Sequence, residues 1–306
     1  MAKERNEGKS GSDKAPWLAK ERLAGVLFTA PAVILLAVFL VIPFVLAIWF
    51  SFTDKRLVSP LPTESVGFKN YSDTLTDPAF RKAFWNNVWF VLMVVPLQTA
   101  LALFMAVLVN SKLRATKFFR SVYFLPVVIV MTVAAAMWLL IYDKQQGLAN
   151  SVLNAATFGK AESKWLESTT MALPSILIMS IWQGAGFQMT ILLAGLQGIS
   201  PELYEASAID GATPWQQFRH VTLPGLRNTL LFVVTVTTIL AFRLFDQVWV
   251  MTRGAPLGNT STMMLNMVET LNKNDVGKAS AIAVIFFVIV LTLTLIQRAF
   301  VKEQAS

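Results

Sequence analysis

The sequence predicts an all-α membrane protein with six transmembrane helices and a two-helix loop between the fourth and fifth of them. Hydrophobic residues make up 55% of the chain and charged residues only 14%, which is more apolar than an ordinary soluble domain. Apolar runs long enough to cross a hydrocarbon core of about 30 Å recur along it. Tryptophan rings favour the headgroup level. They stand at predicted ends of these runs at Trp49, Trp85, Trp138 and Trp249.

Six apolar runs are predicted to span the membrane. They cover residues 23–52, 84–109, 118–141, 171–196, 229–251 and 279–300. The first run is longer than the roughly 7–15 residues of a secretory signal core and lacks a small-x-small cleavage site, so we expect a retained helix. Residues 1–22 are predicted to form a disordered cytoplasmic tail, and residues 23–306 the transmembrane domain.

Basic residues indicate which side of the membrane each loop occupies. The short connection between the second and third runs carries cations and no acid, and short basic loops stay in the cytoplasm. These cations are Lys112, Arg114, Lys117 and Arg120. Six spans then place both termini in the cytoplasm, together with the loop at residues 199–224. The longer loops 53–83, 142–170 and 252–278 are expected outside.

The loop at residues 199–224, called the coupling loop below, begins with ordered helix signals. In Ser200-Pro201-Glu202, the hydroxyl is expected to cap a helix, the proline suits the first helical position, and the acid suits the positive end of the helix dipole. Asp210-Gly211 is a turn signal because glycine accepts left-handed backbone angles. The first half of the loop is therefore predicted to be a short helix that ends at this turn.

A second short helix is predicted to follow. Thr213-Pro214 repeats the cap-then-proline start, and Trp215, Phe218 and Val221 fall three residues apart on one side. Leu223-Pro224 is expected to end this helix. Exposed aromatic residues on a cytoplasmic hairpin indicate a protein interface. The alternative is a helix pair lying on the bilayer, which would carry several lysines on its polar face, and the loop carries none.

The coupling loop resembles the EAA loop of ABC-importer permeases of the carbohydrate-uptake, maltose-type branch. The resemblance is carried by Glu205-Ala206-Ser207, Asp210-Gly211-Ala212 and Leu223-Pro224. It extends over most of the chain, through Gly67-Phe68-Lys69-Asn70-Tyr71, Asp77-Pro78-Ala79-Phe80, Gly254-Ala255-Pro256 and Gly277-Lys278-Ala279-Ser280-Ala281. Two residues depart from the pattern. Ser207 replaces the third residue of Glu-Ala-Ala, and Asn228 stands where many relatives carry proline.

The resemblance implies a subunit of an ATP-driven importer in a bacterial or archaeal cytoplasmic membrane. A second permease, expected to be a different chain, would complete the pathway. Two ATPase subunits would hold the ATP and Mg, an extracellular binding protein would deliver a sugar, and lipid would surround the spans. This chain would hold no cofactor. Its net charge of +8 is attributed to basic cytoplasmic loops of a membrane protein, so no nucleic acid is expected as a partner. The residues implied in ATPase coupling are Glu205, Ala206, Ser207, Asp210, Gly211, Trp215, Phe218, Leu223 and Pro224.

A substrate path is predicted near the middle of the fourth run. Transporter sites lie near the bilayer midplane, and a rise of ~1.5 Å per residue puts Trp182–Gln188 roughly 16–26 Å deep. Its amides can hydrogen-bond hydroxyls and its rings can stack on a sugar. The alternative for its glycines is close helix packing. The resemblance favours a pocket. The residues of this run assigned to the path are Trp182, Gln183, Gly184, Phe187 and Gln188.

The third and fifth runs add further path candidates, namely Thr132, Thr237, Thr238, Ala241, Arg243 and Asp246. A cation inside a membrane helix costs about 2.5–3.5 kcal/mol on insertion scales, so Arg243 needs a partner or water. Asp246, one helical turn on, can supply the charge. Two roles stay open for Arg243: a structural ion pair with Asp246, or a part of the path. Pro126, in the third run, is expected to kink that helix.

Several other classes of protein fit the sequence less well. The only histidine is His220 and cysteine is absent, which excludes a histidine triad and thiolate metal sites. No Gly-x-x-x-x-Gly-Lys-Ser/Thr loop is present, so ATP hydrolysis must come from a partner. A stand-alone secondary transporter or channel would expect acids or histidines within the membrane, and the spans offer almost none apart from Asp246. A purely structural anchor is the third alternative. Among substrates, glycerol phosphate or another small polar solute is the alternative to a sugar.

Overall fold

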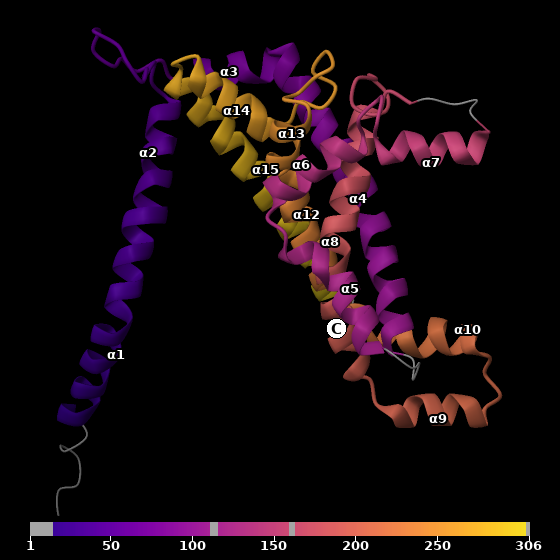
Figure 1. Cartoon of the computed structure of the whole chain (residues 1–306). Helices are drawn as coiled ribbons and strands as arrows, with labels where there is room; N and C mark the ends of the chain where they lie inside the picture. Colours follow the sequence, from indigo (N-terminus) through magenta and orange to yellow (C-terminus); the bar gives the residue numbers. More distant parts are fainter. Residues whose placement is uncertain (1–14, 111–115, 159–162, 304–306) are drawn as a thin grey trace, which may run out of the picture.

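The computed structural model describes residues 15–110, 116–158 and 163–303. The secondary structure of this part of the chain is helical, apart from two isolated β-bridges. Most of the helices gather in one bundle (Figure 1). Two cations on which the predicted orientation depends, Lys112 and Arg114, lie outside the described residues, as do the first fourteen residues of the predicted tail.

Five helical segments of the described chain are long and apolar enough to cross a membrane. They are α1 (Ala15–Leu36) continued by the π-helical turn η1 (Ala37–Val41) and α2 (Ile42–Ser51), α4 (Pro78–Asn110), α8 (Ala172–Gln197), α12 (Arg227–Phe242) continued by α13 (Asp246–Met251), and α15 (Val276–Glu303). They cover five of the predicted runs. The first begins earlier than expected, because α1 already starts at Ala15.

The third predicted span is two helices. It consists of α5 (Thr116–Val128) and α6 (Met131–Ile141), which are bent by 99° at the break between them. The break follows Pro126, whose carbonyl accepts a tight-turn hydrogen bond from the Ile129 N–H at 3.2 Å. Val130 is then extended and α6 starts in a new direction. The expected kink is therefore a nearly right-angled break, and the described part of the chain has six spans only if this bent pair counts as one.

Helix α8 lies at the centre of the bundle, in contact with α4, α5 and α12. The largest side chains in these contacts are fully buried. They include Phe90 on α4 and Ile176, Met179, Met189 and Leu192 on α8. Lipid tails are as apolar as these side chains, so the helices are held by close packing and by interhelical hydrogen bonds.

Two glycines of α8 bring neighbouring helices unusually close. A Cβ on Gly186 would lie 2.1 Å from the Tyr123 carbonyl oxygen of α5. A Cβ on Gly184 would lie 2.5 Å from the Gln98 side-chain nitrogen of α4. The packing explanation therefore holds for both glycines, but with different neighbours: backbone at Gly186 and a flexible side chain at Gly184.

Short helices lie at one end of the bundle, namely α3 (Lys69–Thr76), α7 (Leu148–Thr157) and α14 (Met263–Asn272) (Figure 1). The buried Asn87 side chain of α4 ties two elements together there. Its Nδ2 donates to the Phe242 carbonyl at 3.1 Å, and its Oδ1 accepts from the Met263 N–H at 2.9 Å. The end of α12 and the start of α14 are thus fixed to one residue of α4.

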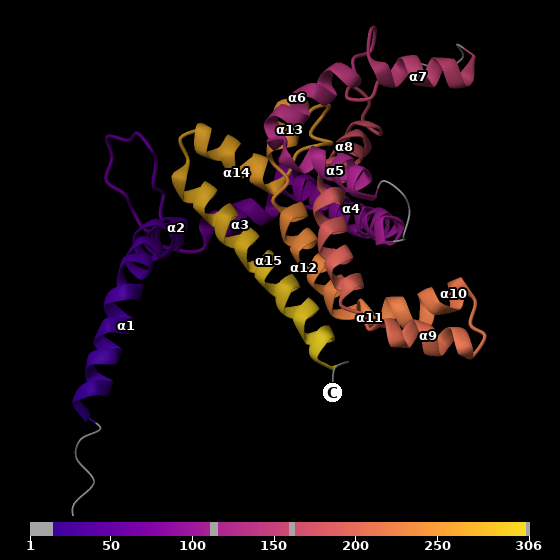
Figure 2. The same ribbon diagram turned by 60° about the horizontal axis from the view of Figure 1, so that its bottom comes forward.

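Helix α1 diverges from the bundle in both views (Figures 1 and 2). None of the apolar window of its span is buried against the rest of the chain. Contact is made by α2, which packs on α15 with the Phe44 and Phe287 ring centroids 4.7 Å apart. The apolar surface of α1 is therefore available to lipid or to another subunit.

The two glycines of α8 predict a difference in stability between matched variants. We expect Gly186→Ala to destabilise the fold by about 1–3 kcal/mol, because its methyl group meets a backbone oxygen that cannot move alone. Gly184→Ala displaces only the Gln98 side chain, so its loss of stability should be smaller. Thermal unfolding of both variants in detergent, followed by size-exclusion chromatography, measures this order. Equal melting temperatures for the two variants would contradict the packing account of Gly186.

Candidate functional site

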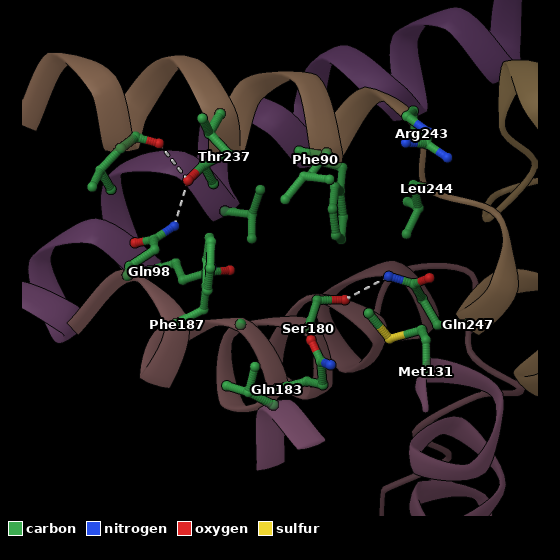
Figure 3. Close-up of a pocket in the computed structure, with 18 of the residues that line it drawn as sticks. Phe90, Gln98, Met131, Ser180, Gln183, Phe187, Thr237, Arg243, Leu244 and Gln247 are labelled. Atoms are coloured by element: carbon green, nitrogen blue, oxygen red, sulfur yellow. Dashed lines mark hydrogen bonds between the residues drawn. The ribbon is translucent and has the colours of Figure 1, made fainter. Parts of the chain in front are cut away.

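A cavity of about 440 Å³ lies inside the bundle, between α4, α8 and α12 and beside the break of α5 and α6. Figure 3 shows side chains from these elements facing one another across it. Its apolar wall includes Phe90, Val94, Val127, Met131, Ile191, Val233, Val236, Leu240 and Leu244. Its polar groups are Gln98, Ser180, Gln183, Gln188, Thr237, Arg243, Asp246 and Gln247. The cavity is thus an apolar chamber with several amide and hydroxyl groups and one charge of each sign.

Two buried hydrogen bonds connect α8 to the opposite wall of the cavity. Gln188 Nε2 donates to Thr237 Oγ1 on α12, and that hydroxyl donates to the Val233 carbonyl at 2.7 Å. On α13, Gln247 Nε2 lies 3.2 Å from Ser180 Oγ (Figure 3). The Oε1 of Gln188 is buried and accepts no hydrogen bond from the described part of the chain.

Most of the predicted path residues come together at this cavity. Gln183, Gly184, Phe187 and Gln188 line it from α8, and Thr237, Ala241, Arg243 and Asp246 line it from α12 and α13. Phe187 is 42% exposed and thus presents its ring to the open space. Residues far apart in the sequence therefore form one site.

Three predicted path residues lie elsewhere. Trp182 packs edge-on against Trp138 at 5.6 Å as part of the apolar core. Thr238 accepts a hydrogen bond from Gln297 on α15 at 3.0 Å and lines a separate apolar cavity between α4, α12 and α15. Thr132 is exposed in the first turn of α6, next to the break, while the adjacent Met131 faces the cavity. Each of these residues is next in sequence to one that lines the cavity, and a step of one position around a helix points its side chain away from the cavity.

The expected ion pair between Arg243 and Asp246 is absent from the structure. The prediction assumed one continuous helix, but α12 ends at Phe242 and α13 begins at Asp246. Arg243 is the C-cap of α12, and Asp246 lies in the first turn of α13. Each charge therefore stands at the helix end whose partial charge it complements. Both residues are exposed, and both line the cavity.

Three residues outside the predicted path also belong to the site, namely Gln98, Ser180 and Gln247. All three are buried polar residues that line the cavity. Gln98 stands within the long apolar run of α4, where a polar side chain is itself a signal of function. Ser180 and Gln247 form a hydrogen-bonded pair across two spans, and that pairing depends on the tertiary structure.

The coupling loop forms two short helices, α9 (Pro201–Ile209) and α10 (Pro214–Gln217), as predicted. Gly211 connects them with a left-handed φ of +77°. Thr213 caps α10 in a capping box with Gln216, whose Oε1 accepts from the Thr213 N–H at 2.7 Å. The expected cap by Ser200 is wrong, because its side chain makes no cap hydrogen bond to α9.

Hydrogen bonds join the two helices of the coupling loop into one unit. Gln217 Nε2 donates to Ser207 Oγ at 3.1 Å, and Ser207 in turn donates to the Tyr204 carbonyl at 2.8 Å. The Tyr204 hydroxyl lies 3.0 Å from Thr222 Oγ1. Ser207, which departs from the Glu-Ala-Ala pattern, thus provides a polar contact that alanine could not make.

The outer surface of the coupling loop combines acidic and apolar side chains. Glu205, Ala206 and Asp210 are exposed, and Ile209 is 87% exposed. Trp215 is 68% exposed and stacks on Phe218 with ring centroids 5.5 Å apart. The loop also exposes Arg219 and His220, so its surface carries apolar groups and charges of both signs.

The helical backbone continues from α10 into the membrane. A π-helical turn, η2 (Phe218–Thr222), and the short α11 (Leu223–Gly225) link α10 to α12. Pro224 lies at the start of α11, and this short helix ends at Gly225, one residue past the predicted end. Leu226 forms a turn before α12 begins at Arg227. The Leu226 N–H donates to the Thr222 carbonyl at 2.9 Å, which closes the junction with α12. The coupling loop and one wall of the cavity are therefore parts of one helical path.

The described residues contain no group of three or more His, Cys, Asp or Glu side chains that could hold a metal ion. The polar groups that line the cavity are amides, hydroxyls and two charges.

Residues 21–305 match the family described as "Binding-protein-dependent transport system inner membrane component". Over 278 residues, the chain is 33% identical to the trehalose/maltose transport system permease protein MalF of Thermococcus litoralis, covering 90% of this chain and 93% of that protein. It is 33% identical over 275 residues to the sulfoquinovosyl glycerol transport system permease protein SmoG of Agrobacterium fabrum, covering 90% and 89% of the two chains.

The fold is similar to that of a chain in a crystal structure of a bacterial alginate ABC transporter in complex with an alginate pentasaccharide-bound periplasmic protein. The TM-score is 0.81 at 19% identity, and the match covers 93% of this chain and 96% of that one. The chain therefore belongs to the family of inner-membrane components of binding-protein-dependent transport systems, the permease subunits of ABC transporters, which are not enzymes themselves.

Proposed function

We propose that this chain is the transmembrane subunit of an ATP-driven importer that takes up a sugar or oligosaccharide delivered by an extracellular binding protein. One observation carries the proposal. Helix α12, which lines the cavity with Thr237 and Ala241, is joined to α10 of the coupling loop through η2 and α11, with only the turn residue Leu226 between α11 and α12. A force applied to the coupling loop thus reaches the wall of the cavity.

The groups that line the cavity support a polyhydroxylated substrate. Amides from Gln98, Gln183, Gln188 and Gln247 can each donate and accept hydrogen bonds, as sugar hydroxyls do. The ring of Phe187 offers an apolar face for a sugar ring. The relatives named for trehalose/maltose and for sulfoquinovosyl glycerol support the same class of solute.

A small anionic solute such as glycerol phosphate is the second candidate. It is favoured by Arg243, which lines the cavity without an ion-pair partner in the described chain. Asp246 lines the same cavity, and its negative charge disfavours an anion. A neutral sugar is compatible with both charges, since its hydroxyls can donate to the carboxylate and accept from the guanidinium.

The surfaces of the chain support the proposed partners. A second permease, expected to be a different chain, would contact the apolar surface of α1, which has no cover in the described chain. Two ATPase subunits, which hold the ATP and Mg, would receive the coupling loops. The binding protein would dock at the opposite end of the bundle, near α3 and α14. Both termini and the coupling loop would then lie in the cytoplasm.

The mechanism uses the coupling loop as a lever. When the ATPase subunits close on ATP, they move α9 and α10 together, because Ser207 and Gln217 join the two helices. The motion passes through η2 and α11 into α12. This shifts Thr237 relative to Gln188, and the cavity opens to the opposite side of the membrane.

The lever predicts the effect of a charge change on α9. In the complex with its partner subunits, Glu205→Lys should reduce ATP hydrolysis stimulated by the binding protein by about tenfold or more, since reversing a paired interfacial charge costs several kcal/mol. Glu205→Gln should lie between this variant and the wild type. Glu202→Lys makes the same charge change on the same helix outside the motif and serves as the control.

The measurement is ATPase activity in proteoliposomes, together with the amount of assembled complex. The proposal expects each Glu205 variant to insert into the membrane and to retain its unstimulated ATPase. Wild-type stimulation in Glu205→Lys would remove the coupling loop from this role.

A substitution of the cavity residue Arg243 should distinguish the two candidate substrates. For a neutral sugar, Arg243→Gln should leave the KM for uptake within about threefold of wild type, because glutamine keeps a neutral hydrogen-bond donor. For an anion, the substitution removes the attraction between two full charges in addition to the hydrogen bond, so the KM should rise about tenfold or more. Arg253→Gln is the matched control, because Arg253 lies over the Trp249 ring and does not line the cavity. Uptake of the labelled solute in proteoliposomes gives the KM.

A further inference from the structure

Helix α7 (Leu148–Thr157) extends sideways from the bundle, at the end away from the coupling loop, in both views (Figures 1 and 2). Its ten residues include no charged side chain. Leu148 and Val152 are 66% and 68% exposed, and Ala155 and Ala156 are exposed beside them. Residues spaced by three, four and eight positions share one side of a helix, so α7 presents a single apolar face.

The polar side of α7 is already engaged with its own loop. Asn150 is only 3% exposed. Its Nδ2 donates to the Lys144 and Ser163 carbonyls, both at 3.1 Å, and its Oδ1 accepts from the Ser163 N–H at 3.1 Å. The same Oδ1 accepts from Trp165 Nε1 at 2.9 Å. These bonds fix the rotation of α7, so its apolar face is held outward.

A chain of contacts sets the depth of α7 relative to the membrane. The Trp165 carbonyl accepts from Ser175 Oγ at 3.1 Å, and the Tyr142 hydroxyl donates to the Ser175 carbonyl at 3.0 Å. The rings of Tyr142 and Trp165 stack at 5.5 Å. Ser175 lies in the first turn of α8, ~5 Å along the helix from its start. The loop segments before and after α7 are therefore fixed at the border of the membrane, where amphipathic rings gather.

We propose that α7 is an interfacial anchor, which lies in the headgroup region of the leaflet opposite the coupling loop and buries its apolar face in lipid. Its depth and its sideways direction place bilayer beneath it. Leu140, in the last turn of α6, is 75% exposed and adds apolar surface just before the loop that leads to α7. A free amphipathic helix needs lysines to reach lipid headgroups, whereas the loop of α7 is already fixed to α8 by hydrogen bonds, so its uncharged apolar face needs only apolar contact with lipid.

The natural chain has no cysteine, which allows a direct test in the full complex. Val152→Cys carries a spin label, and Glu64→Cys, on the exposed loop after α2, is the water-facing control. The unsubstituted chain gives the background from partner subunits. In vesicles of phosphatidylcholine, the ratio of oxygen to nickel-chelate accessibility should be about threefold or more higher at position 152 than at position 64.

A second spin-label position tests whether the apolar face keeps α7 in the lipid. With Ala155→Cys as the reporter, Leu148→Ser together with Val152→Ser should raise the nickel accessibility about threefold, because the helix leaves the lipid. Serine preserves the Asn150 contacts, so the fold of the loop is retained.

Two results would overturn the proposal. One is a nickel accessibility at position 152 equal to that at position 64. The other is a label that nickel reaches in the absence of the binding protein and that becomes shielded when it is added, which would make α7 a docking surface for that protein. Neither measurement depends on transport, so this test is independent of the proposed function.

Discussion

Two buried amide–hydroxyl contacts across one cavity organise this membrane bundle. Gln188 binds Thr237, and Gln247 binds Ser180, so α8 is fixed to α12 and to α13 at two points. Side chains of this kind leave water only when they find partners, and in an apolar bundle those partners come from neighbouring helices. The space between the two contacts is the cavity. The same groups that hold the helices together therefore give the cavity its hydrogen-bonding character.

These contacts also explain how a distant loop can change the cavity. Neutral hydrogen bonds contribute about 0.5–1.5 kcal/mol each, so a lever that moves α12 can break them without unfolding the bundle. The closely packed glycines are a different kind of contact. Gly186 brings α8 against the Tyr123 backbone, where no side chain can yield. A fixed contact with α5 beside breakable contacts with α12 is the arrangement that a hinged wall needs.

Much of this architecture could be predicted from local signals. Apolar length predicts the spans, and the capping and turn residues predict α9, Gly211 and α10. The path residues from Gln183 to Gln188 were identified because polar groups and glycines are rare inside a span. The local signals did not predict where two of the helices are interrupted. The sequence predicts one kinked helix over 118–141 and one continuous helix over 229–251, whereas the structure bends the first by 99° after Pro126 and interrupts the second at Arg243. The break at Arg243 is stabilised by a hydrogen bond from the Asn87 side chain to the Phe242 carbonyl. These residues are 155 positions apart in the sequence, so local patterns cannot predict their contact.

The break between α12 and α13 explains why two opposite charges can face one cavity without pairing. A continuous helix would have placed Asp246 one turn from Arg243, where the charges neutralise each other. With the break, Arg243 stands at the carboxyl end of α12 and Asp246 at the amino end of α13, so each charge is balanced by backbone dipoles. Asn87 maintains the break by binding the Phe242 carbonyl. The guanidinium and the carboxylate therefore keep their hydrogen-bonding capacity for a solute, and the Asn87 amide, which never touches the cavity, preserves that capacity.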